Sequence, residues 1–121
     1  IGVNDISHDL STDSIVNMIE KNVTRIQRES PETKLYLQSL LPIDESFNRY
    51  KKLTNKTYQI PEINDRLKAL AKEKKIDFID LYPLFTEKGT NVLRKELTYD
   101  GLHLKEEGYK IWVDAIKKKM K

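Results

Sequence analysis

Asp100 and His103 are the residues whose types and spacing fit catalytic chemistry most directly. They lie three positions apart in a segment that leads into a predicted helix, so the carboxylate can turn back to one nitrogen of the imidazole. Such a carboxylate fixes the tautomer of the ring and stabilises the imidazolium that forms when the other nitrogen takes a proton. The same pattern also fits a helix N-cap carboxylate beside a surface histidine. The pair alone therefore does not decide between catalysis and capping.

A second group of candidate residues lies at the beginning of the chain, where Gly2 and Asn4 follow what reads as the end of a strand. The side-chain amide of Asn4 can donate a hydrogen bond to a developing oxyanion. Gly2 allows the backbone to turn sharply or to approach a ligand closely. The alternative for Asn4 is an Asx-turn that only shapes the loop.

Two further groups of side chains are weaker candidates. An acidic cluster with one histidine fits a metal site, although loop and helix-cap carboxylates explain it better. Its members are Asp5, His8, Asp9 and Asp13. Several tyrosines fit an acyl or sugar pocket, although packing with a solvated hydroxyl is their commoner role. These tyrosines are Tyr36, Tyr50, Tyr58, Tyr82 and Tyr99.

The composition is that of one folded domain at most, with 121 residues, 38% of them hydrophobic and 34% charged. The longest apolar stretches are too short to span a bilayer. The net charge is only +3, and several of the basic residues are the lysines after position 116, where they complement a helix C-terminus. We therefore expect no nucleic-acid partner. The absence of cysteine excludes thiolate zinc sites and a cysteine nucleophile.

The elements that must position the candidate residues alternate along the chain. Apolar spacing predicts helices over 11–29, from Pro61 to 75, and over 105–119. Short apolar runs predict strands over 34–41 and 76–81. Between them lie an aperiodic loop over 43–59 and a long connection over 82–102, which is a length typical of functional loops.

This order predicts an α/β fold with parallel strands and helices on both faces. In such sheets ligands bind beyond the carboxyl ends of the strands, where both candidate segments fall. Because the chain opens on a strand end, we expect it to be a piece of a longer domain, whose exposed sheet edge pairs with a second copy or with the missing N-terminal fragment. A signal peptide would lie upstream of Ile1, so the localisation stays open.

Together these segments resemble the SGNH (GDSL-type) hydrolases. Gly2-Val3-Asn4-Asp5 is similar to the third conserved block of that family, and Asp100-Gly101-Leu102-His103-Leu104 is similar to the fifth. Leu40-Leu41-Pro42 resembles the end of the strand between them. The resemblance covers essentially the whole chain, as the C-terminal part of a single domain over residues 1–121.

The resemblance implies a flavodoxin-like three-layer αβα sandwich and the hydrolysis of esters through an acyl-enzyme. It implies that His103 is the general base, that Asp100 orients it, and that Asn4 and Gly2 belong to the oxyanion site. It implies no metal and no organic cofactor. The implied partner is a small ester, with acylated carbohydrates as our first candidate and lysophospholipids as another.

The sequence departs from the family at the nucleophile, because nothing here matches the Gly-Asp-Ser block. The serines present lie in other contexts, and they are Ser7, Ser11, Ser14, Ser30, Ser39 and Ser46. We therefore predict that the chain alone is nearly inactive. Two alternatives remain: a non-catalytic hydrolase-like module that binds a carbohydrate or a protein, and a flavodoxin-like nucleotide or receiver domain, which the lack of a glycine-rich loop disfavours.

Overall fold

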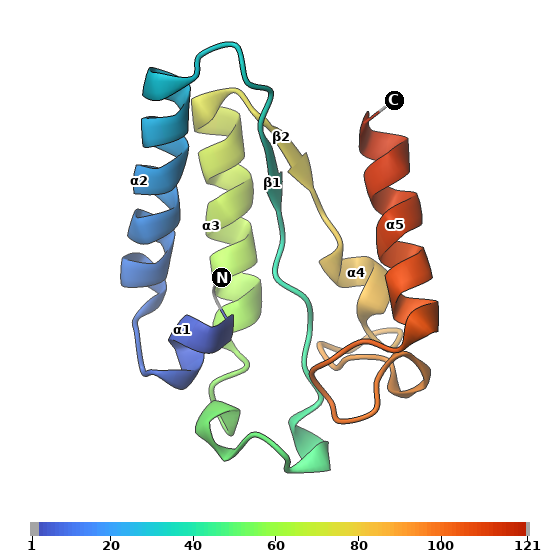
Figure 1. The fold of residues 1–121 in the computed structure, drawn as a ribbon. Coiled ribbons are helices and arrows are strands. Elements are labelled where there is room, and N and C mark those ends of the chain that lie inside the picture. Colours follow the sequence, from blue (N-terminus) through green and yellow to red (C-terminus); the bar gives the residue numbers. More distant parts are fainter. Residues whose placement is uncertain (1–2, 121) are drawn as a thin grey trace.

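Two short strands, β1 (Tyr36–Gln38) and β2 (Asp77–Ile79), pair in parallel at the centre of the molecule (Figure 1). The computed structural model describes residues 3–120, without the side chain of Asn4. Both strands lie inside the predicted apolar runs, but each is only three residues long. The predicted parallel arrangement is confirmed for these two strands. The predicted strand end at Ile1 lies outside the described residues.

Helix α2 (Thr12–Glu29) has the start that the sequence predicts. Ser11 is its N-cap, and the Ser11 hydroxyl accepts a hydrogen bond of 3.1 Å from the backbone amide of Ser14. This bond satisfies one of the amides that the first turn of a helix leaves unpaired. The spacing predicts an apolar stripe of Ile15, Ile19, Val23 and Ile26, flanked by Val16 and Met18. Of these side chains Ile15, Val16, Ile19 and Val23 are buried, whereas Met18 and Ile26 are exposed.

Helix α3 (Gln59–Lys74) connects the two strands and begins two residues before Pro61, where the sequence placed its first residue. A turn over the preceding loop leads into it, because the amides of Gln59 and Ile60 donate to the carbonyls of Lys56 and Thr57. Proline is still tolerated near this end, since the first-turn amides have no partner within the helix.

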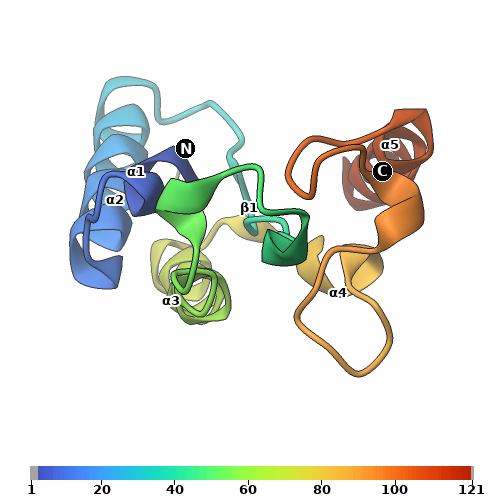
Figure 2. The ribbon, with the colours of Figure 1, turned by 90° about the horizontal axis from the view of Figure 1, so that it is seen from below.

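The strands are covered on both faces, which is what parallel strands require. Leu37 and Phe78 pack against the core that α2 and α3 form. Tyr36 and Ile79 belong to a second core on the opposite face. Figure 2 shows α2 and α3 on one side of β1, with α4 (Tyr82–Phe85) and α5 (Glu106–Met120) on the other.

Helix α5 (Glu106–Met120) turns only part of its predicted apolar face to the core. The spacing of apolar residues predicts a face made of Tyr109, Trp112, Val113, Ile116 and Met120, but Tyr109, Val113 and Met120 are exposed. The residues that pack against the second core are Ile111, Trp112, Ala115 and Ile116. Trp112 is only partly buried, and its indole N–H donates to the Gln38 side chain at 3.0 Å.

The segment Val3–Ser7, which we predicted to be a loop after a strand, forms the short helix α1. Asn and Asp are typical of loops, but Ile6 is fully buried and anchors this turn in the core. Asp5 lies in the first turn, where a negative charge is favourable.

The two long connections are organised by short helical turns. The connection after β1 contains the 3-10 helices η1 (Glu45–Phe47) and η2 (Lys51–Leu53). The connection after β2 contains α4 and the 3-10 helix η3 (Lys95–Leu97). No helix among the described residues has the length and apolar composition needed to cross a bilayer.

Candidate active site

The segment that carries Asp100 and His103 is a closed loop at the end of the molecule toward which both strands run (Figure 1). An antiparallel bridge between Thr98 and Leu104 closes the loop. The amide of Lys105 also donates to the carbonyl of Leu97 at 2.7 Å. The loop therefore lies at the carboxyl ends of the parallel strands, where open α/β sheets bind their ligands.

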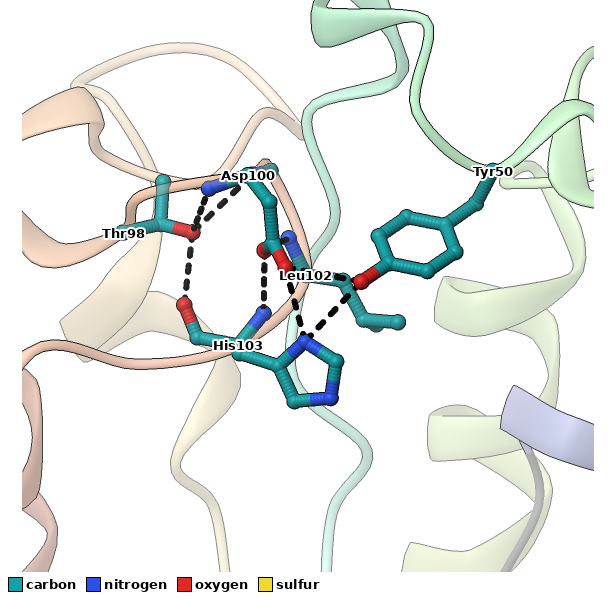
Figure 3. A network of polar contacts seen from close by, with 6 residues as sticks. Tyr50, Thr98, Asp100, Leu102 and His103 are labelled. Atoms are coloured by element: carbon teal, nitrogen blue, oxygen red, sulfur yellow. Dashed lines mark hydrogen bonds and ion pairs between the residues drawn. The ribbon is translucent and has the colours of Figure 1, made fainter.

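Thr98 holds the inside of this loop together (Figure 3). Its hydroxyl donates to the backbone carbonyl of His103 at 2.6 Å and accepts from the amide of Gly101 at 3.0 Å. The amide of Asp100 approaches the same oxygen at 3.3 Å. Thr98 is buried, so these bonds fix the loop without competition from water. The sequence analysis did not single out Thr98, although a threonine two residues before Asp-Gly is a turn signal.

Gly101 gives the loop its sharp turn and its contact with the neighbouring connection. Its φ is +89°, a conformation that other residues rarely adopt. Its carbonyl accepts from the amide of Asp44 at 2.9 Å. A Cβ atom at this position would collide with the carbonyl oxygen of Asp44 and lie 3.2 Å from the Phe47 ring. Only glycine fits both the dihedral angle and the space.

The structure brings Asp100 and His103 together, as their spacing predicts. Oδ2 of Asp100 lies 2.8 Å from Nδ1 of the His103 ring. Oδ1 accepts from the backbone amides of Leu102, at 2.9 Å, and His103, at 2.8 Å. Because an ionised carboxylate only accepts, Nδ1 carries the proton and Nε2 is left as the basic nitrogen. Figure 3 shows Nε2 on the side of the ring away from Asp100.

Tyr50 is a third member of this network, and it comes from the connection between β1 and α3. Its hydroxyl donates to Oδ2 of Asp100 at 2.7 Å and lies 3.1 Å from Nδ1 of His103. The two rings meet edge to face, with their centroids 5.9 Å apart. The sequence placed Tyr50 only among the candidate pocket tyrosines. The sequence around Tyr50 gives no indication of its contact with Asp100, because Tyr50 lies in an aperiodic loop far from Asp100 along the chain.

These hydrogen bonds keep Asp100 ionised. Burial raises the pKa of this carboxyl, but the bonds from the His103 ring and amide, the Tyr50 hydroxyl and the Leu102 amide together bring the pKa well below its usual value. In turn, the hydrogen bond to Asp100 raises the pKa of the Tyr50 phenol, and desolvation raises it further. Tyr50 therefore stays a neutral donor, and Asp100 stays a negative partner for the imidazole.

An open cleft of about 750 Å³ lies beside the His103 ring. It is lined by residues of α1, of the segment around η2 and of the Asp100–His103 loop. These are Val3, Ser7, Arg49, Tyr50, Lys51, Lys52, Leu53, Leu102 and His103. The His103 side chain is 67% exposed while that of Asp100 is 16% exposed. The imidazole is thus accessible from the cleft, whereas its carboxylate partner is covered.

The remaining predicted site residues lie at the beginning of the chain. Gly2 is outside the described residues, and for Asn4 the structure describes only the backbone, within α1. Val3 and Ser7 of the same helix line the cleft together with His103. The helix that carries Asn4 therefore borders the same cleft.

Most of the serines are engaged in structural roles. The buried Ser39 hydroxyl accepts from the amides of Leu81, at 3.0 Å, and Tyr82, at 3.1 Å. Ser11 caps α2, and Ser46 donates to the Asp44 carboxylate at 2.5 Å. Ser7 is the serine that lines the cleft with His103.

The acidic cluster near the beginning of the chain is not arranged as a metal site. Asp9 pairs with Lys56, and Asp13 pairs with Arg66 of α3. Among residues 3–120, no group of three potential ligands is placed to hold a metal ion. These carboxylates instead connect the beginning of the chain to the helix and loop beside it.

A histidine oriented by a carboxylate, at the carboxyl ends of parallel strands covered by helices, is typical of hydrolases with an α/β architecture. Comparison with known families gives the particular class. Residues 1–111 match the family model of the GDSL-like lipase/acylhydrolase family, and the chain belongs to that family. The resemblance seen in the sequence is therefore confirmed.

Relatives of known sequence or structure agree with this assignment. The chain is 38% identical over 65 residues to the isoamyl acetate-hydrolysing esterase of Saccharomyces cerevisiae, a match over 54% of this chain and 26% of the yeast protein. A GDSL-like lipase of Bacteroides thetaiotaomicron superimposes with a TM-score of 0.84 at 26% identity, over 98% of this chain and 58% of that one.

A more distant structure shares the fold alone. It is the esterase domain of a zebrafish retrotransposon protein, with a TM-score of 0.70 at 23% identity over 99% of this chain and 64% of that one. The matches thus span about a quarter of the yeast esterase and between half and two thirds of the two solved structures.

Proposed function

We propose that this chain supplies the general base and its orienting carboxylate to an ester hydrolase that works through an acyl-enzyme. The contact of 2.8 Å between Nδ1 of His103 and Oδ2 of Asp100, beside an open cleft, carries the proposal. Membership in the GDSL-like lipase/acylhydrolase family supports ester hydrolysis as the reaction class.

In the first half of this reaction Nε2 of His103 takes the proton of a serine hydroxyl as its oxygen attacks the ester carbonyl. Asp100 stabilises the imidazolium, which then gives the proton to the departing alcohol. In the second half Nε2 takes a proton from water, whose oxygen attacks the acyl carbon, and returns the proton to the serine. The side-chain amide of Asn4, together with the Gly2 segment, is our candidate for the oxyanion donors.

The attacking serine, in this proposal, is not one of those in the chain. Ser11, Ser39 and Ser46 are engaged in caps and loop contacts, and the sequence around Ser7 does not match a nucleophile block. A catalytic triad that lacks its nucleophile keeps only a residual activity. In other enzymes its rate is about 10³–10⁴ times that of the reaction in water. We therefore expect the 121-residue chain alone to be nearly inactive.

We further propose that the chain is the C-terminal part of a single domain, a flavodoxin-like three-layer αβα sandwich. Helices on both faces of β1 and β2 support this arrangement. The superposition on the GDSL-like lipase also supports it, because the chain matches only 58% of that longer protein.

A small ester is the substrate that fits the proposal. The yeast relative is named for the hydrolysis of isoamyl acetate, which favours a short acyl group. Acylated carbohydrates stay our first candidates among acetyl esters, because long polar loops surround the site.

The test is the hydrolysis of 4-nitrophenyl acetate by the chain and by its His103→Ala and His8→Ala variants, His8 being the only other histidine. We expect a rate far below the roughly 10 s⁻¹ of an ordinary esterase, and we expect His103→Ala but not His8→Ala to remove the excess over buffer. An ordinary esterase rate that His103→Ala abolishes would place the nucleophile within the chain, with Ser7→Ala as the next variant. A rate that His103→Ala leaves unchanged would refute the site itself.

A further inference from the structure

The cleft beside His103 is bordered by three basic side chains. Arg49, Lys51 and Lys52 all line it, and no Asp or Glu is among its lining residues in the described part of the chain. Each of the three is exposed. The molecule as a whole carries only +3, so this is a local concentration of positive charge at the candidate active site.

The fold of the segment explains why the charges face the cleft. Tyr50 is the N-cap of η2, and its hydroxyl donates a hydrogen bond to Asp100. Leu53, at the other end of η2, is buried in the core. With both ends of this turn held, the basic residues between and beside them stay at the rim of the cleft.

Nearby carboxylates neutralise this rim only in part, because Asp9, which pairs with Lys56, also interacts electrostatically with Lys52. Within residues 3–120 no ion pair within 4.0 Å involves Arg49, Lys51 or Lys52, whereas the neighbouring Lys56 is paired with Asp9. Asp100 is engaged by His103 and Tyr50 and is largely covered. None of the three cations is therefore held in a close ion pair with a described residue.

The cleft also has apolar lining residues, which are Val3, Leu53 and Leu102. A ligand that uses both features has a short aliphatic chain beside these side chains and a negative charge at the basic rim. Its ester carbonyl would then lie near the exposed imidazole of His103.

We propose that the cleft selects esters that carry a negatively charged group, such as a carboxylate, at the end of a short aliphatic chain. The inference rests on the proposed function, because it takes the cleft beside His103 as the substrate site. Arg49, Lys51 and Lys52 are the specificity-determining residues. They attract the anion and do not take part in the proton transfers.

The test compares two probes of equal length, monoethyl adipate and the primary amide of the same compound, in which the carboxylate is replaced by an uncharged group. Binding to the 121-residue chain is followed by NMR, through the His103 ring protons and the Leu102 amide. We expect the anionic probe to bind about fivefold more tightly at low salt, as one screened ionic contact allows, and the difference to shrink as salt is added.

The variant for this test replaces the three cations together, as Arg49→Gln, Lys51→Gln and Lys52→Gln. The matched control carries Lys72→Gln, Lys88→Gln and Lys117→Gln, three exposed lysines that do not line the cleft. Both variants lose the same net charge. We expect the first to bind the two probes equally and the control to keep the preference for the anion.

The possible results distinguish a failure of this inference from a failure of the proposed function. Equal binding of both probes at His103 and Leu102 would leave the ester site standing and would overturn the selection for an anion. The same would follow if the control variant lost the preference as fully as the cleft variant. Failure of both probes to shift these signals would refute the cleft as a substrate site, and the inference with it.

Discussion

At the scale of single residues, the Asp100 carboxylate is the group on which the site depends. Four donors converge on it: two side chains on Oδ2 and two backbone amides on Oδ1. A carboxylate with its acceptor positions so filled stays ionised and cannot rotate. The imidazole of His103 is therefore held in one tautomer, with Nε2 on the side of the ring away from Asp100. This is the condition that general base catalysis requires.

Tyr50 strengthens this arrangement, and its removal has a pH-dependent effect on stability. The pKa of Asp100 is lower in the folded chain than in the unfolded chain. The resulting contribution to the free energy of unfolding is present above the unfolded pKa, about 3.9, and is lost as the pH falls toward the folded pKa. Tyr50→Phe removes one of the bonds that lower the folded pKa, so this contribution shrinks. We expect the variant to be destabilised more at pH 5 than at pH 3, as measured by urea unfolding.

The control for this prediction is Tyr58→Phe, since Tyr58 is 62% exposed and lies in the same connection. It should change the free energy of unfolding equally at both pH values. If Tyr50→Phe also gave a constant difference, the hydroxyl of Tyr50 would not be coupled to the ionisation of Asp100.

The sequence predicted the Asp100–His103 contact because three positions are a local distance that a short loop can close. It could not predict Tyr50, because that contact spans 53 positions to His103 and depends on how two connections pack. Thr98 lies between these cases. Its place before Asp-Gly is a turn signal, but its bond to the His103 carbonyl follows only from the closed loop.

At the scale of the elements, the turn at Gly101 fixes the loop that holds Asp100 and His103. We expect Gly101→Ala to lower the free energy of unfolding by about 3 kcal/mol, from backbone strain and the collision with the Asp44 carbonyl. Because the backbone of Asp44 cannot move aside as a side chain would, the loop must shift. The His103 ring signals should therefore also move in the NMR spectrum.

Gly89 offers a matched control, since its φ is also positive, at +75°, but nothing lies within 4 Å of the position that a Cβ atom would take there. Gly89→Ala should cost only the strain, about 1 kcal/mol, and leave the His103 signals in place. Equal losses in the two variants would mean that the packing of Gly101 on Asp44 contributes nothing.

Helices were predicted better than strands, for physical reasons that particular elements illustrate. The Ser11 cap of α2 and most of its apolar stripe are found, because both depend on residues close together in the sequence, although Ile26 of the stripe is exposed. The strands are only three residues long, shorter than the apolar runs from which they were predicted. The length of a strand depends on its pairing with a partner distant in the sequence, which a local pattern does not show. In α5 the pattern indicated a helix but not which residues face the core, since Tyr109 and Val113 extend the apolar stripe while remaining exposed.

At the scale of the whole molecule, two cores lie on opposite faces of a very narrow sheet. The alternation of strands and helices predicts helices on both faces of the sheet, and Leu37 and Tyr36 of β1 pack in different cores. The amino-acid sequence does not indicate what covers the outer edge of each strand, which is the edge away from the other strand. Among the described residues each strand pairs with one neighbour only.

This narrow sheet leads to our last prediction, that the 121-residue chain associates through a strand edge. The outer backbone groups of β1 and β2 have no strand partner in the described part of the chain, and unpaired edges are templates for another strand. Light scattering should show a mass that rises with protein concentration, and the amides at the strand edges should exchange more slowly in the concentrated sample. The amides inside α2 serve as the control, because their bonds lie within the helix in monomer and oligomer alike. A constant monomer mass up to millimolar concentration would contradict edge pairing, and slower exchange in α2 alone would place the contact elsewhere.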